Sequence, residues 1–256
     1  MSGHNKWSTI KRKKGALDAK RSALFSRIAK EIAVAVKEGG PDPDGNPRLR
    51  TAINNAKGVS MPKDNIERAI SKSAGDGVTY TEVTFEGYAP GGVAVFIECL
   101  TDNNNRTVAS IRSIFNKRNG TLGTNGSLSS VFDRKGVVTL NVPAGKDVDE
   151  FQMELIEMGA DDFDDVVEDE DEGTKTLVCY TSMEGFAGFT KALDEAKIET
   201  TNASLQRIAA EYNMKELDTA SGVSVLKMIE AFEDDDDVQA VYHNLVVTEE
   251  MEAAME

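Results

Sequence analysis

The spacing of apolar residues changes near residue 78, and this change divides the chain into two parts of different fold class. Before it, apolar residues recur at helical intervals, as Phe25, Ile28 and Ile32 do, which predicts amphipathic helices. After it, β-rich runs such as Thr81–Tyr88 and Val93–Thr101 alternate with helical patterns. A chain of 256 residues has room for two or three domains with separate cores.

The first part is predicted to be a basic arm followed by three short helices. Gly39 and Gly40 end the first helix, and Asn46-Pro47 has the N-cap and first-turn chemistry of the second. Ser60-Met61-Pro62 begins the third helix, and glycines near residue 77 close the domain.

The second part is predicted to contain two α/β domains. A hairpin turn at Ala89–Gly92 joins the first two strands, and Asn105 is expected to cap the helix that follows. A short strand is expected near Leu128–Phe132. From Val137 the order strand–helix–strand–strand–helix–strand is that of a ferredoxin-like domain. The remaining elements are a strand, a helix and a strand, expected near Leu205–Ala210, Ser221–Phe232 and Val238–Val247.

These three last elements supply the missing half of the domain that begins at residue 78. We therefore predict a multi-domain α+β protein, in which an N-terminal three-helix domain precedes two ferredoxin-like α/β domains, one inserted into the other. The predicted domains are a helical domain at 1–77, a discontinuous α/β domain at 78–135 and 202–256, and an acidic inserted domain at 136–201.

Charge is distributed unevenly between the two parts. Residues 1–77 carry a net charge of +8, whereas residues 78–256 carry −23. Because salt screens charges beyond about 8 Å, a basic segment attracts polyanions even when the whole chain is acidic. The run Lys11–Lys14 lies close to Trp7, and cations beside an aromatic ring suit phosphates and unpaired bases. Trp7 is equally well explained as a hydrophobic anchor. For the basic run, nucleic-acid binding is favoured over a solvated tail, because the helices that follow repeat the same charge bias.

The candidate nucleic-acid contacts are the basic and aromatic residues of this first part. They are His4, Lys6, Trp7, Lys11, Arg12, Lys13, Lys14, Lys20, Arg21, Arg27, Lys30, Arg48, Arg50, Lys57, Lys63 and Arg68.

Other motifs favour structural roles. The loop Gly120–Gly126 follows a helix and precedes a strand, which is the wrong context for a phosphate-binding loop. Capping and turn chemistry explain Asp102–Arg106. The acidic clusters Asp161–Asp165, Glu168–Glu172 and Asp234–Asp237 lack the spacing of a calcium loop and are expected to be solvated.

The sequence indicates no catalytic residues, no metal site and no cofactor. His4 and His243 are the only histidines, and neither belongs to a set with zinc or triad spacing. Cys99 and Cys179 lie in apolar runs and are expected to be buried, reduced thiols. We therefore expect a protein that is not an enzyme and has no small-molecule substrate.

Several motifs closely resemble those of the YebC family. They are Gly3-His4-Asn5-Lys6-Trp7-Ser8, the stretch from Gly39 through Arg50 to Ile70, Glu86–Val95, Leu100–Thr107 and Leu122–Ser127. The resemblance covers the whole chain, although residues after about 140 match by pattern and length more than by motif. It implies a helical domain and two ferredoxin-like α/β domains, one inserted into the other, without catalytic activity.

The family includes probable transcriptional regulators that bind DNA, and also translation factors that act on ribosomes. The resemblance implies that His4, Lys6, Trp7, Lys11–Lys14, Arg48, Arg50, Lys63 and Arg68 are contact residues. We expect a cytoplasmic, ribosome-associated factor that contacts rRNA or tRNA, because Lys and Arg with one aromatic ring suit recognition of shape and phosphate. The alternatives are a transcriptional regulator that binds promoter DNA and a module that binds an acidic protein. No membrane partner is expected, since no apolar run approaches the length of a membrane span.

Overall fold

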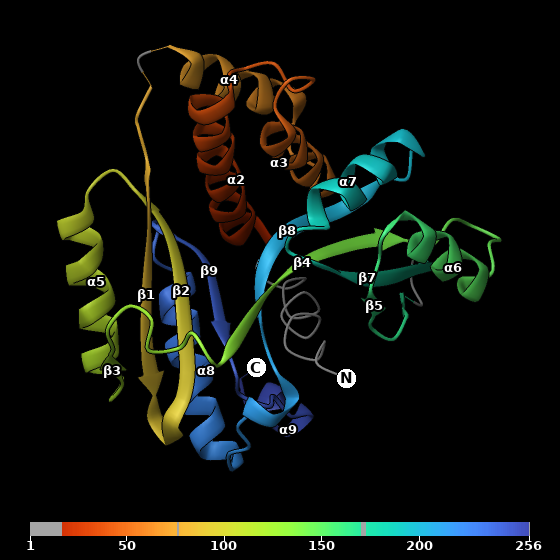
Figure 1. Cartoon of the computed structure of the whole chain (residues 1–256). Coiled ribbons are helices and arrows are strands. Elements are labelled where there is room, and N and C mark those ends of the chain that lie inside the picture. The colour runs from red at the N-terminus through yellow and green to blue at the C-terminus, as the bar shows by residue number, and fades with distance from the viewer. Residues whose placement is uncertain (1–16, 76, 170–172, 256) are drawn as a thin grey trace. The chain divides into compact units, whose positions relative to one another are not determined.

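The computed structural model describes residues 17–75, 77–169 and 173–255 and has an α+β fold (Figure 1). The chain forms two compact units. Of the described residues, unit 1 contains 17–30, 78–133 and 208–255, and unit 2 contains 31–75, 77, 134–169 and 173–207. The helix α2 (Leu17–Gly39) therefore contributes its first part to unit 1 and its second part to unit 2.

Unit 1 is built on a four-stranded sheet with the order β3-β1-β2-β9. Its strands are β1 (Thr81–Ala89), β2 (Val93–Thr101), β3 (Thr121–Leu122) and β9 (Val238–His243). The expected hairpin is confirmed: β1 and β2 pair antiparallel from Thr81–Thr101 to Ala89–Val93. Gly91 and Gly92 turn the chain with φ of 76° and 75°, a conformation that glycine adopts without steric cost.

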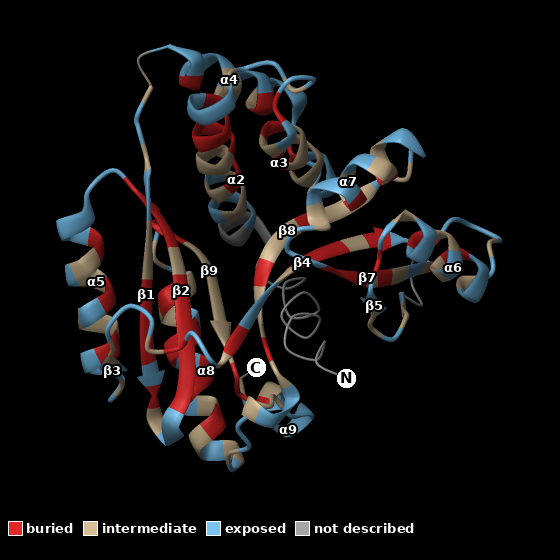
Figure 2. Ribbon diagram, viewed as in Figure 1, coloured by how far each residue is buried: buried red, intermediate tan, exposed pale blue. Residues whose placement is uncertain are grey.

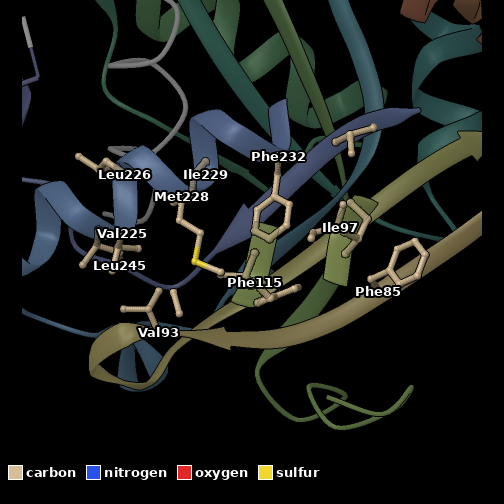
Figure 3. Close-up of a cluster of buried hydrophobic side chains, with 14 of the residues drawn as sticks. Phe85, Val93, Ile97, Phe115, Val225, Leu226, Met228, Ile229, Phe232 and Leu245 are labelled. Carbon is tan, nitrogen blue, oxygen red and sulfur yellow. The ribbon is translucent and has the colours of Figure 1, made fainter. Parts of the chain in front are cut away.

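The main core of unit 1 lies between this sheet and two helices, α5 (Asn104–Lys117) and α8 (Thr219–Glu233). Phe115 of α5 packs against Phe232 of α8 with ring centroids 4.8 Å apart, and Figure 3 shows both rings near Ile97 of the central strand β2. Figure 2 shows β2 buried along nearly its whole length. Asn103, rather than the expected Asn105, caps α5, because its side chain accepts a hydrogen bond from the Arg106 N–H.

The opposite face of the sheet carries a second, smaller core. It contains Ala94, Phe96, Leu128, Phe132 and Ala209. The expected short strand near Leu128–Phe132 is wrong: residues 123–131 form turns, and the strand β4 (Phe132–Asn141) begins only at Phe132. Figure 1 shows this turn segment crossing β1 and β2 on the way from β3 to β4.

Unit 2 contains a sheet with the order β5-β7-β4-β8, in which β6 also pairs with β7. Its further elements are α6 (Val148–Met158), β5 (Asp162–Phe163), β6 (Val167–Asp169), β7 (Thr174–Ser182), α7 (Phe186–Glu195) and β8 (Thr200–Ala209). This strand order, with antiparallel β4–β7 and β5–β7 pairs, is the arrangement of a ferredoxin-like sheet. The core between this sheet and its helices is formed by residues such as Leu140, Phe151 and Phe189.

The helices α3 (Pro47–Gly58) and α4 (Lys63–Ala74) complete unit 2. The Asn46 side chain caps α3 by accepting the Leu49 N–H at 3.1 Å, and Pro47 occupies its first turn, as the sequence predicts. The Asn46 amide also donates to the Ala35 and Gly40 carbonyls at 2.7 and 2.9 Å, which ties the start of α3 to the end of α2.

The two sheets establish that one α/β domain interrupts the other. The elements β4–β8 of the second sheet fall between β3 and β9 of the first. The units change at residues 134 and 207, a few residues outside the expected insertion at 136–201. Residues 31–77 group with the inserted domain, so the two packed units divide the chain differently from the expected three domains. The remaining short elements are two 3₁₀ turns and one helix, η2 (Pro90–Gly92), η3 (Glu211–Asn213) and α9 (Glu249–Ala253).

Candidate nucleic-acid interface

The positive charge of the N-terminal part is concentrated at its start. Residues 1–16 contain five Lys or Arg and no acidic residue, whereas residues 17–77 contain eleven against eight. The candidates His4, Lys6, Trp7, Lys11, Arg12, Lys13 and Lys14 all lie outside the described residues. Lys20 lies on α2, and its side chain is outside the described part.

The candidates of α2 in unit 1 make contacts within the protein. An Arg27 Nη atom donates to the carbonyl oxygen of Glu233 at the end of α8. Lys30 Nζ donates to the carbonyl oxygens of Leu100 and Asp236 at 3.2 and 2.7 Å. Lys30 Nζ also lies 3.2 Å from a carboxylate oxygen of Asp237. Both side chains thus attach α2 to the rest of unit 1.

Asp237 is the centre of a polar cluster that sequence reasoning missed. Its side chain is 6% exposed, and it accepts hydrogen bonds from Arg106 at 2.8 Å, Thr107 at 2.8 Å and Thr101 at 3.2 Å. Burial alone would raise the pKa of Asp237, but hydrogen bonds from Arg106, Thr107 and Lys30 keep this pKa below its usual value. The motif Asp102–Arg106 therefore serves this cluster as well as the capping of α5.

Arg48 and Arg50 on α3 are also engaged with other groups of unit 2. Arg48 forms ion pairs with Glu38 at 2.7 Å and with Glu31 at 3.5 Å. Arg50 donates to the Pro43 and Asp44 carbonyls at 3.2 and 3.1 Å. The charge of Arg48 is thus neutralised by acidic side chains, and the guanidinium group of Arg50 is held by backbone carbonyls, so both expected phosphate ligands already have partners within the protein.

The helix α3 is fixed against the strand β8 of the inserted domain. Asn55 donates to the Ala203 carbonyl at 2.8 Å and accepts the Ala203 N–H at 2.7 Å, so its amide pairs with the strand as a neighbouring peptide would. Gly58 lies so close to β8 that a Cβ atom there would stand 2.7 Å from the Thr201 carbonyl carbon. The helix α4 follows α3, and its residues Lys63, Asp64, Glu67, Arg68 and Lys72 are exposed to solvent.

The α3–α4 surface, which we define as Lys57, Lys63, Arg68 and Lys72, is the exposed basic surface of this helix pair. All four residues are exposed. Lys63 forms an i,i+4 pair with Glu67 at 3.5 Å between well-solvated side chains, which contributes little to stability. Lys57, Arg68 and Lys72 have no side-chain partner among the residues that the structure describes. Lys72 is not among the expected contacts, although it follows Arg68 by one helical turn.

The helix α4 bears acidic groups as well. Asp64 and Glu67 are exposed on the same helix. The outer side of α4 is therefore mixed in charge, so its cations can contact phosphates only at positions away from these acidic groups.

The described residues carry little that points to catalysis. No group of three or more His, Cys, Asp or Glu side chains in residues 17–75, 77–169 and 173–255 is placed to hold a metal ion. Cys99 and Cys179 are buried free thiols, as expected. Burial raises the pKa of each to about 12, so neither is a thiolate at neutral pH. In the same part of the chain, no helix is long and apolar enough to cross a membrane.

Two domain families match the chain over nearly its whole length. Residues 5–76 match the TACO1/YebC protein N-terminal domain, and residues 80–245 match the TACO1/YebC second and third domain.

Full-length relatives and one solved structure agree with these matches. A probable transcriptional regulatory protein of Geobacter sp. (strain M21) is 50% identical over 252 residues, with 98% of each chain covered. One of Geobacter sulfurreducens is 49% identical over 260 residues, with both chains fully covered. The crystal structure of a conserved hypothetical protein from Aquifex aeolicus superposes with a TM-score of 0.76 at 38% identity, covering 91% of this chain and 93% of that one. The chain therefore belongs to the TACO1/YebC family.

Proposed function

We propose that this protein is a non-enzymatic, nucleic-acid-binding regulator of gene expression that works in the cytoplasm as a ribosome-associated translation factor. Its basic arm and the α3–α4 surface would contact rRNA or tRNA. The observation that carries the proposal is the concentration of positive charge in the sequence: five Lys or Arg in the first sixteen residues without one acidic residue. Lys57, Arg68 and Lys72 add three that have no partner among the described residues.

The net charge of the remaining chain makes the basic segment the main source of attraction to nucleic acid. Residues 78–256 carry a net charge of −23, which repels phosphate over most of this part of the chain. Cations that neutralise phosphates release counterions from the nucleic acid, so affinity from this source falls steeply with salt.

A second candidate function is transcriptional regulation through duplex DNA. Relatives of this chain carry the name probable transcriptional regulatory protein. In addition, only residues 59–62 separate α3 from α4, which is a turn length common in DNA-binding helix pairs. Asp64 and Glu67 on the exposed side of α4 would repel the phosphates of RNA and of DNA alike, so they do not favour either candidate.

A sucrose gradient distinguishes the two candidates. Lysate containing tagged protein is sedimented at near-physiological salt, untreated, DNase-treated or RNase-treated. We expect the protein to travel with ribosomes, to keep that position after DNase, and to move to the top after RNase. Absence from ribosomal fractions in the untreated lysate would contradict the translation proposal and leave promoter DNA as the target to search for.

Variants that change charge locate the contact. Changing Lys11, Arg12, Lys13 and Lys14 together to Glu should release the protein from ribosomes. In purified form, it should lower the magnitude of the log–log salt slope by roughly 0.7–0.9 for each lost phosphate contact. An unaltered affinity and slope would mean that the run is only a solvated tail.

The α3–α4 surface is tested with a matched control. The triple variant K57Q/R68Q/K72Q removes three positive charges from this surface, and K175Q/K191Q/K197Q removes three exposed ones from the inserted domain. We expect the first variant to weaken binding and reduce the salt slope, and the second to leave both unchanged. Equal losses in the two variants would indicate a general charge effect and contradict a contact at α3–α4.

A further inference from the structure

We infer that unit 1 carries a second nucleic-acid contact, which takes single-stranded RNA. It consists of residues 123–131, here called the Glu86 loop, with Tyr212 at one end and Lys117 and Arg118 at the other. This inference rests on the proposed function, since it presumes that the protein binds nucleic acid. It goes further by assigning a second surface, separate from the N-terminal basic residues, and by naming single-stranded RNA as its ligand.

The Glu86 loop is held in one conformation by a buried carboxylate. Glu86 is 5% exposed, and its two oxygens accept the Gly126 and Leu128 N–H groups, each at 2.7 Å. The Glu86 carbonyl accepts the Gly123 N–H, also at 2.7 Å. Leu128 is buried in the smaller core of unit 1, next to Phe96. Hydrogen bonds to a charged acceptor are stronger than neutral ones, so the loop is an ordered part of the surface.

This anchoring leaves polar side chains on the outside. The exposed residues of the loop are Thr124, Asn125, Gly126, Ser129 and Ser130. Their hydroxyl and amide groups offer donors and acceptors of the kind that read the edges of unpaired bases.

Tyr212 stands beside the far end of the loop and is 86% exposed. The 3₁₀ turn η3 that carries it is fixed, because the Asn213 side chain donates to the Ser130 and Val131 carbonyls at 3.0 and 3.2 Å. Asn244, which is buried, donates in turn to the Asn213 carbonyl at 2.5 Å. An aromatic ring presented to solvent on a rigid turn is a stacking platform for a base.

The charges place the phosphates at the other end of the loop. Lys117, in the last turn of α5, and Arg118, its C-cap, are exposed and have no side-chain partner within the described part of the chain. Glu211 beside Tyr212 is exposed and acidic, so it disfavours a phosphate next to the ring. A strand whose phosphate lies at Arg118 and whose base stacks on Tyr212 fits this polarity. Bases within a duplex are already stacked, so a duplex cannot use the ring.

The test measures the binding of a short, unstructured RNA and of a DNA duplex by fluorescence anisotropy. We expect Y212A to weaken RNA binding roughly 5- to 150-fold, the effect of losing one base–aromatic stack, and to leave duplex binding unchanged. Y212F keeps the ring and should bind RNA within about twofold of wild type. K117Q/R118Q should reduce the salt slope for RNA by about 0.7 per contact.

A fluorescent variant reports the stack directly. In W7F/Y212W, the tryptophan at the platform is the only one in the chain, so RNA should quench its emission and shield it from iodide. Emission that is unchanged under saturating RNA would overturn the inference.

The outcomes separate this inference from the proposed function. If Y212A and K117Q/R118Q bind RNA as wild type does while the four-Glu arm variant does not, the second contact is wrong and the proposed function stands. If the wild-type protein binds neither RNA nor DNA, both are wrong. Equal weakening of RNA and duplex DNA by Y212A would overturn the assignment to single strands.

Discussion

The carboxylate of Asp237, at the start of β9, accepts hydrogen bonds from the guanidinium group of Arg106, in the first turn of α5, at 2.8 and 2.9 Å. The same carboxylate receives Lys30 from α2. One buried acidic side chain thus joins three segments of unit 1 that are far apart in the sequence. The acidic run Asp234–Asp237, which looks like a solvated cluster, contains one member with a structural role.

Replacing Asp237 with asparagine is expected to lower the free energy of unfolding by about 1.5–3 kcal/mol, the range for hydrogen bonds to a charged group. The value should not reach that of a fully buried ion pair, because the Arg106 side chain is 54% exposed and regains water. Urea unfolding followed by circular dichroism measures the change.

The control is D102N. Asp102 pairs with the same Arg106 at 2.8 Å, but its side chain is 46% exposed, so its loss should cost less than about 1 kcal/mol. Equal losses for D237N and D102N would show that burial of Asp237 adds nothing to this pair.

Acid stability is expected to depend on His243. Burial lowers its pKa in the folded protein to about 4, against an ordinary value of 6.5, and its Nδ1 atom accepts the Leu245 N–H at 3.3 Å. Between these two values the unfolded chain binds a proton that the folded chain does not, so stability falls as the pH is lowered from about 6.5 to 4. Replacing His243 with asparagine should flatten this part of the curve of stability against pH. A slope that is unchanged in H243N would contradict the assignment of this loss to His243.

Local patterns in the sequence predict the elements well, and long-range pairing explains the failures. Asn46-Pro47 begins a helix and Gly91-Gly92 closes a hairpin because both depend on neighbouring residues alone. The expected strand near Leu128 fails because the carboxylate of Glu86, some forty residues earlier, takes the N–H groups that a strand would use.

Which of the candidate cations are free to bind a ligand could not be predicted from the sequence, for a similar reason. Arg27 and Lys30 look free on the helical pattern, but their partners lie 206 or 207 residues further along the chain. Arg48 is neutralised by Glu38 only because the turn after α2 brings α3 alongside it. A count of charges in a segment cannot reveal which cations are already paired.

Gly58 is expected to be essential for the packing of α3 on β8. In G58A the new Cβ atom would lie 2.7 and 2.8 Å from the carbonyl carbon and Cα of Thr201, so the helix and the strand must separate at a cost of about 1–3 kcal/mol. G188A is the matched control: this glycine lies exposed inside α7 with nothing within 4 Å of a Cβ atom. It should stabilise the protein by about 0.5–1 kcal/mol. Thermal unfolding of both variants measures these opposite signs, and a neutral G58A would contradict the close approach.

Glu86 is expected to control the order of the loop at residues 123–131. In E86Q one carboxylate oxygen becomes an NH₂ group, which cannot accept the N–H of Gly126 or Leu128. Because one of these donors is then left without its acceptor, the free energy of unfolding should fall by about 1.5–3 kcal/mol. Amide hydrogen exchange at Gly126 and Leu128 should accelerate more than exchange in β2.

The control for this prediction is N125A, which alters an exposed side chain of the same loop. It should leave stability within about 0.5 kcal/mol of wild type and leave exchange at Leu128 unchanged. If E86Q exchanges no faster than N125A at these two amides, the loop is ordered by the burial of Leu128 and not by the carboxylate. If E86Q loosens the loop and also weakens RNA binding while Y212F does not, the order of the loop itself is what presents the polar side chains to the ligand.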